Sequence, residues 1–134
     1  MAVERTYIML KPDCIRRGLM GEVISRIEKK GYKITDAKMM RLGEAILREH
    51  YAHLVDKPFF PDIVAFMTSG PVLGMIVEGE NAVAGMRALM GATKFEDMAA
   101  GTIRGDFAFN TSENIIHGSD SKETAEIEIK RFFG

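Results

Sequence analysis

The chain of 134 residues has only one cysteine and no long apolar run. Cys14 has no partner for an internal disulfide, so nothing points to secretion. The longest apolar run lies within Pro71–Val77 and is far too short to span a bilayer. The N-terminus carries charges at Glu4 and Arg5 and lacks the apolar core of a signal peptide. We therefore expect a cytoplasmic protein with no membrane partner.

An excess of one charge sign is also missing. The 18 lysines and arginines are balanced by 19 acidic residues, which leaves a net charge of −1. This balance gives no electrostatic footprint for DNA or RNA, so nucleic acid is not expected as the main partner. The hydrophobic fraction of 46% and the length suit one globular domain with a real core. We expect a single domain over residues 1–134.

Several sequence patterns that identify enzymes are absent as well. The chain contains neither of the Gly-rich phosphate loops, G-x-x-x-x-G-K-[ST] and G-x-G-x-x-G, and its cysteine and histidine spacing fits no metal site. His50 and His53 are three residues apart on an expected helix, but no third ligand follows at usable spacing. We interpret both as surface histidines and expect no metal ligand among the side chains.

What the sequence does contain is a regular succession of strand and helix patterns. Strands are expected at residues 6–10, 32–41, 72–78 and in the apolar run before His117. Helices are expected from Met20 to a left-handed Gly31, at 44–54, at 63–67, after an N-cap at Asn81, and at 121–133. From Gly91 to Thr111 the periodicity disappears, and so long a loop in a compact domain is more often functional than idle.

The core of this order is β-α-β-β-α-β. That pattern predicts a ferredoxin-like α+β sandwich, in which helices cover one face of a four-stranded antiparallel sheet. The fold hosts many functions, so it does not by itself choose one.

The stretch Asn114–Ser121 joins an apolar run, a histidine, a glycine and a polar cluster. His117 would lie between a strand end and a helix N-terminus, where free N–H groups favour an anion. Asp120 with Glu123 fits a capping box for that helix. Imidazole can act as a base, a metal ligand or a nucleophile near neutral pH. The same pattern also fits an ordinary strand-to-helix turn with an incidental histidine.

Other polar side chains are scattered along the chain. Three of them, Lys11, Arg87 and Arg104, are cations that could neutralise a polyphosphate. Glu128 adjoins the apolar face of the last helix and could reach inward toward the residues before that helix. Composition alone does not bring these groups together in space.

Asn114–Ser121 (N-I-I-H-G-S-D-S) resembles the active-site signature of nucleoside diphosphate kinases. The likeness extends along the chain, in the family's order, through Glu4–Asp13, Arg17–Glu22, His50-Tyr51, Lys57–Phe60, Ser69-Gly70-Pro71 and Gly101–Phe107. It therefore covers nearly the whole sequence, and it supplies a function that the residues alone leave open.

The resemblance implies a phosphotransferase that works by ping-pong transfer. The γ-phosphoryl group of a nucleoside triphosphate such as ATP would pass to His117 and then to a nucleoside diphosphate. The nucleophile of the family is Nδ1 of the matching histidine. Glu128 would hold Nε2, Ser119 would support that carboxylate, and Tyr51 would help to orient Lys11 and the imidazole.

The resemblance also indicates which residues would bind the nucleotide's phosphates. Lys11, Arg87 and Arg104 would bind them and stabilise the group in transfer, and Thr93 would donate to a phosphate oxygen. Mg²⁺ would be held mainly by the phosphates and water, so no protein ligand is named for it.

For the nucleoside, Asn114 and Lys11 would contact the sugar hydroxyls. Phe59 would stack on one face of the base, with Thr111 near the other. Stacking tolerates any base because every base has a π-face.

The chain departs from the usual family pattern at several positions. Cys14 replaces a small residue, Thr93-Lys94-Phe95 replaces Thr-Asn-Pro, Ala99-Ala100 lacks a proline, and Thr111 is usually apolar. The sequence also ends at Gly134, short of the C-terminal segment of most members. The family implies a homo-oligomer built from dimers, first of all a hexamer, with a tetramer or dimer as alternatives.

Two other interpretations stay open at this point. One is a non-catalytic ferredoxin-like module that binds nucleotide or RNA, although the strands lack the K/R-G-F/Y-G/A-F-V pattern of RNA-recognition domains. The other is a family member that has been repurposed for regulation.

Overall fold

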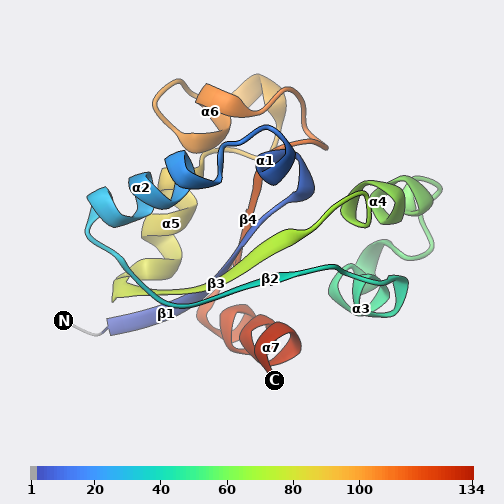
Figure 1. Cartoon of the computed structure of the whole chain (residues 1–134), viewed down its shortest axis with the longest axis horizontal. Coiled ribbons are helices and arrows are strands. Elements are labelled where there is room, and N and C mark those ends of the chain that lie inside the picture. The colour runs from blue at the N-terminus through green and yellow to red at the C-terminus, as the bar shows by residue number, and fades with distance from the viewer. Residues whose placement is uncertain (1–2) are drawn as a thin grey trace.

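A four-stranded antiparallel sheet forms the centre of the computed structural model, which describes residues 3–134 (Figure 1). The strands are β1 (Val3–Leu10), β2 (Lys33–Met40), β3 (Val72–Glu80) and β4 (Ile116–Gly118), in the order β2-β3-β1-β4. β1 pairs with β3 over its whole length and with β4 on its other side. The first strand of the sequence therefore lies inside the sheet, and the last strand pairs with it at one edge.

Seven α-helices and two short 3₁₀ helices are described in residues 3–134. Their bounds are α1 Pro12–Arg16, α2 Met20–Lys30, α3 Glu44–His50, α4 Phe60–Met67, α5 Ala82–Met90, α6 Ile103–Phe107, α7 Lys122–Phe133, η1 Ala52–Leu54 and η2 Phe95–Asp97. In order, β1-α2-β2-β3-α5-β4 is the expected core, so the ferredoxin-like prediction is confirmed. Over the same residues, no helix has the length and apolar character needed to cross a bilayer.

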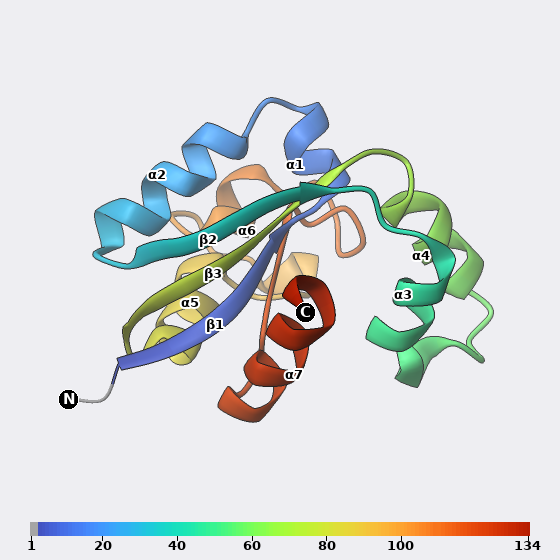
Figure 2. The same cartoon turned by 60° about the horizontal axis from the view of Figure 1, so that its bottom comes forward.

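Helices cover both faces of the sheet, where the sequence predicted cover on one face only. α2 and α5 lie on one side of the sheet and α7 on the other (Figures 1 and 2). The reason lies in β1, whose successive side chains point to opposite faces. Ile8 and Leu10 pack with α2 and α5, whereas Tyr7 and Met9 pack with α7, and all four are fully buried. A strand that is apolar on both faces needs cover on both.

The second face is closed by an aromatic contact between α7 and β1. The ring of Phe132 stacks on the ring of Tyr7, with centroids 4.8 Å apart and planes 2° from parallel. Leu47 of α3 and Met67 of α4 complete this core. Each fully buried side chain of this size contributes roughly 1.5–3 kcal/mol, so α7 is fixed firmly against the strand that it must face.

Several expected elements occur with shifted ends. β1 begins at Val3 rather than at residue 6, and Pro12 ends the strand but also begins α1 as its first residue. The expected helix 44–54 is divided at Tyr51 into α3 and η1. The loop expected from 91 to 111 contains α6, which the hydroxyl of Thr102 caps by accepting from the Gly105 N–H.

The ends of α2 and α5 show how far the capping preferences of single residues predict the structure. Gly31 ends α2 with a φ of 110°, the left-handed conformation expected for it. Asn81 occupies the N-cap position of α5 but makes no side-chain cap bond. The carboxylate of Glu4 accepts from the Val83 N–H instead, at 3.2 Å, so the cap comes from a neighbouring strand.

The start of α7 corrects a prediction made from the sequence. The capping residue is Ser121, whose hydroxyl accepts from the Thr124 N–H at 3.0 Å. The expected box of Asp120 with Glu123 is wrong by one residue. The true pair has the same three-residue spacing, and a run of Ser-Asp-Ser offers the same chemistry in two registers.

Two glycines make room for the ring of Tyr32. A Cβ on Gly79 would lie 2.4 Å from this ring, and a Cβ on Gly85 of α5 would lie 1.6 Å from its hydroxyl oxygen. The ring is thus clamped between β3 and α5 because neither glycine has a side chain.

We expect Gly85→Ala to destabilise the fold by about 1–3 kcal/mol, because the methyl group overpacks the Tyr32 contact. Denaturant unfolding measures this change. Gly21→Ala is the matched control: its Cβ would meet nothing within 4 Å, so it should be neutral or stabilising by up to about 1 kcal/mol. Equal stabilities of the two variants would contradict the packing argument.

Candidate active site

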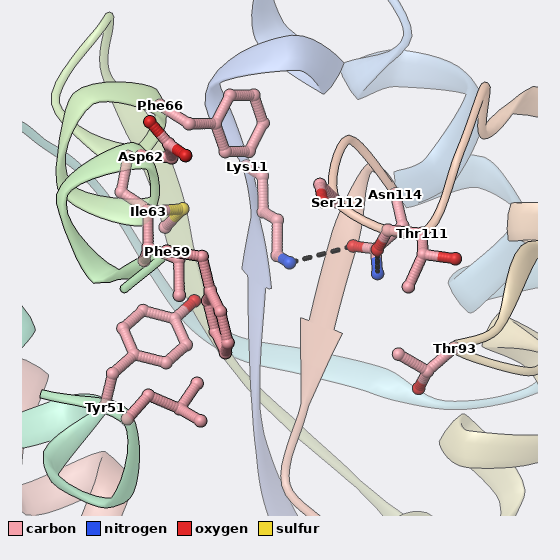
Figure 3. Close-up of a pocket in the computed structure, with 12 residues that line it drawn as sticks. Lys11, Tyr51, Phe59, Asp62, Ile63, Phe66, Thr93, Thr111, Ser112 and Asn114 are labelled. Atoms are coloured by element: carbon pink, nitrogen blue, oxygen red, sulfur yellow. Dashed lines mark hydrogen bonds between the residues drawn. The ribbon is translucent and has the colours of Figure 1, made fainter. Parts of the chain in front are cut away.

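A cleft of about 400 Å³ opens where β1 ends (Figure 3). One wall comes from α4 and the segment between α3 and α4, and the other from the segment that precedes β4. Six of the predicted site residues line it: Lys11, Tyr51, Phe59, Thr93, Thr111 and Asn114. The fold therefore gathers residues from four separate parts of the chain into one pocket.

Lys11 lies between the two walls and is tied to one of them. Its Nζ donates to Oδ1 of Asn114 at 2.8 Å, and Nδ2 of Asn114 donates to the carbonyl of Thr111 at 2.9 Å. Burial lowers the pKa of Lys11 to about 8, and the nearby charge of Arg104 adds to this, while Asp13 opposes it. A buried cation of this kind favours binding of an anion, because the anion replaces the interactions with water that the ammonium group has lost.

His117 is presented by β4, opposite Met9 of β1. Its Nε2 lies 2.9 Å from Oε1 of Glu128, and the hydroxyl of Ser119 donates to the same oxygen at 2.6 Å. Because a carboxylate only accepts, the ring proton is assigned to Nε2, which leaves the lone pair of Nδ1 free. The His117 side chain remains 22% exposed, so a ligand can reach it.

The Glu128 carboxylate is charged although it is buried. Burial alone would raise its pKa, but the hydrogen bonds that it accepts from His117 and Ser119 bring the pKa below its ordinary value. Glu128 does turn inward, as expected from its place beside the apolar face of α7.

Two guanidinium groups flank the histidine by holding the backbone on either side of it. Arg104 donates to the carbonyl of Ile116 at 2.7 Å, and Arg87 donates to the carbonyl of Gly118 at 3.1 Å. Arg104 also lies 3.5 Å from the hydroxyl of Thr93. Two of the three predicted cations thus hold the residues directly before and after His117.

The backbone before β4 is strained and is clamped by the turn after β1. Ile115 has a φ of +76°, which is unusual for a β-branched residue and costs on the order of 1–3 kcal/mol. Its N–H donates to the buried carboxylate of Asp13 at 3.1 Å, and its carbonyl accepts from the Lys11 N–H at 2.8 Å. These two bonds hold the segment that presents His117.

His50 is not the surface histidine that the sequence predicted. Its side chain is 1% exposed, and its ring meets the His117 ring edge-on with centroids 4.8 Å apart. Nη1 of Arg131 lies 2.9 Å from Nδ1 of His50. The spacing from the buried Leu47 to His50 was the available signal, whereas His53 is exposed as expected.

His50, His117 and Glu128 offer ligand atoms within 4.8 Å of one another, which is the one such group found in residues 3–134. The guanidinium of Arg131 occupies the lone pair of His50 Nδ1, so a cation is already present at that position. We assign no metal ion to these side chains.

A second cavity, of about 560 Å³, lies beside His117 on the side of α7. Arg87, His117 and Glu128 line it, and Tyr51 borders both this cavity and the first cleft. Most of the predicted residues therefore line one of two cavities that share Tyr51, and His117 lines the second.

Comparison with known proteins decides among the interpretations that the residues left open. The nucleoside diphosphate kinase family model matches residues 4–134. The nucleoside diphosphate kinase of Moorella thermoacetica is 53% identical over 133 residues, which cover 99% of this chain and 96% of that protein. A nucleoside diphosphate kinase of Thermus thermophilus is 51% identical over 131 residues, which cover 98% of this chain and 96% of that protein.

This chain belongs to the nucleoside diphosphate kinase family. A solved kinase from Halobacterium salinarum, in complex with CDP, has a TM-score of 0.94 and 48% identity, and the match covers 98% of this chain and 88% of that one. The protein is therefore an enzyme, a kinase that transfers phosphate between nucleotides. This finding displaces the non-catalytic binding module.

For this kinase, we expect Asp13→Ala to lower the free energy of unfolding by about 1–3 kcal/mol, because the buried Ile115 N–H loses its acceptor. Asp13→Asn keeps an acceptor oxygen and should lose less. Thermal or denaturant unfolding compares the two. If the alanine variant is as stable as the asparagine variant, the clamp contributes nothing.

Proposed function

We propose that this kinase works by ping-pong transfer through a phosphohistidine at His117. The observation that carries the proposal is the bond from Nε2 of His117 to Glu128, which leaves Nδ1 as an unprotonated nucleophile. Glu128 and Ser119 keep this tautomer and fix the ring. No separate base is then needed, because the attacking nitrogen carries no proton.

In the first half-reaction the lone pair of Nδ1 attacks the γ-phosphorus of a nucleoside triphosphate. The N–P bond forms, the bond from phosphorus to the β,γ-bridging oxygen breaks, and a nucleoside diphosphate leaves with that oxygen and its electrons. In the second, a terminal oxygen of another diphosphate attacks the same phosphorus, and the N–P electrons return to Nδ1. Glu128 balances the positive charge that the phosphorylated ring carries.

The phosphates would be bound by the cations around the imidazole. Lys11, Arg87 and Arg104 would bind and neutralise them, and Thr93 would donate to a phosphate oxygen. The mutual repulsion of these cations supports this role. Burial is the largest cause that lowers the pKa of Lys11 and of Arg104, and the charge of Arg104 lowers the pKa of Lys11 further, as the charge of Arg87 does for Arg104. A polyphosphate would relieve this repulsion. Burial raises the pKa of Tyr51 to about 12, so its hydroxyl stays protonated to orient Lys11 and the imidazole.

The nucleoside would occupy the outer part of the 400 Å³ cleft. Phe59 is 47% exposed there, which suits stacking on any base, and Thr111 would lie near the other face. The bonded pair of Lys11 and Asn114 would contact the sugar hydroxyls.

Mg²⁺ is the expected cofactor, and the cleft fits one that is held by the substrate. The predicted phosphate-binding residues are cations with hydroxyl and amide groups, so the metal's oxygen ligands would come from phosphates and water. Bound there, Mg²⁺ would neutralise phosphate charge.

Assembly and location are proposals too. We infer a homo-oligomer built from dimers, with a hexamer as the first expectation, in the cytoplasm. Light scattering would measure the oligomer number.

The proposed intermediate can be tested directly by labelling. Mixing the protein with ATP labelled at the γ-phosphate should give an acid-labile, base-stable phosphoprotein that passes its label to GDP. His117→Gln should abolish labelling and reduce transfer at least about a thousandfold, because the nucleophile is gone. His53→Gln is the matched control, since His53 is an exposed histidine, and it should label normally. Normal transfer by the His117 variant would refute the mechanism.

Nucleotide affinity should fall as the pH rises past about 8. Lys11 has a pKa of about 8 in the free protein, so above that pH it loses the charge that binds phosphate. Calorimetry should find the affinity for a nucleoside diphosphate reduced by about tenfold between pH 7 and pH 9.

The matched variants are Lys11→Arg, which stays charged and should flatten this dependence, and Lys29→Met, an exposed lysine on α2 that should not alter it. Constant affinity of the unmodified protein over this range would contradict the assignment to Lys11.

A further inference from the structure

His50 and Arg131 form a buried pair that the proposed mechanism does not use. The His50 ring packs edge-on against His117, Tyr51 and Phe132, with centroids 4.8–5.1 Å apart. The His50 ring therefore cannot turn without disturbing the His117 ring, and the protonation state of His50 affects His117.

The contact with Arg131 fixes that protonation state. A guanidinium only donates, so at 2.9 Å from Nη1 of Arg131 the Nδ1 atom of His50 must accept and carry no proton. The tautomer of His50 is thereby the neutral Nε2–H form. The Arg131 side chain is itself only 14% exposed, and its Nε faces Glu49 at 3.8 Å without a hydrogen bond, so the bond to His50 is the side-chain hydrogen bond that the described residues show for this guanidinium.

Glu128 is the group for which the two histidines compete. Its Oε1 accepts from His117, and its Oε2 lies only 3.7 Å from Nδ1 of His50. A proton on Nδ1 of His50 would turn that atom into a donor aimed at the same carboxylate. It would also place a second cation 4.8 Å, ring to ring, from the imidazole that becomes positive during transfer.

We propose that Arg131 holds His50 as a neutral imidazole through this hydrogen bond and thereby reserves the Glu128 carboxylate for His117. Arg131 and His50 are positioning residues, and the inference rests on the proposed function of His117.

Most of the other groups around His50 act in the same direction. Its ionisable and polar neighbours are Glu49 and Tyr51 on its own segment, Lys11 after β1, His117 on β4, and Glu128 and Arg131 on α7. Burial first, then His117, Arg131 and Lys11, lower the pKa of His50 to about 3, and Glu128 opposes them. Removing Arg131 removes both a repelling charge and the donor that blocks Nδ1.

The test is Arg131→Met, which keeps an apolar stem and deletes the donor. Rapid mixing with ATP measures the rate of His117 phosphorylation from pH 5.5 to 8.5. We expect the acid limb of this profile to move upward by about one pH unit, so that the variant is about tenfold slower than wild type near pH 6. The difference should narrow toward pH 8.5, and the dissociation constant for nucleotide should stay unchanged.

Three matched variants separate positioning from general damage. Arg131→Lys keeps a charged donor and should restore the wild-type profile. His50→Phe combined with Arg131→Met keeps an aromatic ring that cannot be protonated and should remove the added acid limb. Glu49→Gln alters only the other neighbour of Arg131, 3.8 Å from Nε, and should leave the profile unchanged.

A direct readout does not depend on activity. Nitrogen NMR of the histidine rings should find His50 as the neutral Nε2–H tautomer at pH 6 in wild type, and with a proton on Nδ1 in Arg131→Met, where that atom is free to donate to Glu128. A wild-type His50 that is protonated at pH 6 would overturn the inference, even if the variant failed to fold. So would superimposable pH profiles of wild type and Arg131→Met. Failure of His117 labelling in wild type would instead refute the proposed function.

Discussion

The hydrogen bond between His117 and Glu128 is the contact on which the rest of the site depends. It joins the shortest strand to the last helix, and both are fixed by β1: Met9 pairs with His117, and Tyr7 stacks on Phe132 of α7. The imidazole is aimed by a carboxylate, the carboxylate is held by Ser119, and the helix that carries it is held by the core. Shifting any one of these elements would turn the ring.

The site contains desolvated charges and backbone strain that cost free energy, and nearby hydrogen bonds offset this cost. Lys11, Asp13 and Glu128 are charged groups taken largely out of water, and Ile115 adopts a strained backbone conformation. Each charge has hydrogen-bond partners, and the strained residue is held by bonds at both its N–H and its carbonyl. Strain that persists because the surroundings fix it is typical of a site that must be rigid before its ligand arrives.

Part of the site followed from local pattern. Helical spacing turned Glu128 inward, and Pro12 ended β1 so that Lys11 directly follows the strand. The failures have local causes as well: Asp120 and Ser121 are both residue types that cap helices, and His50 lies on the same helix face as Leu47 although histidine is common on surfaces. The cover on both sheet faces was missed because it depends on β1 being apolar at every position of its second half, not on the order of elements.

The sequence alone determined the types of the core elements, their ferredoxin-like order and, through the likeness of its segments, the family. These depend on neighbours within a few residues or on patterns kept along the chain. Tertiary structure decided what lies around His117: that Arg87 and Arg104 hold the carbonyls beside it, and that Arg131 meets His50. Such contacts join residues from different elements, and their distances depend on how helices and strands pack, which no local spacing specifies.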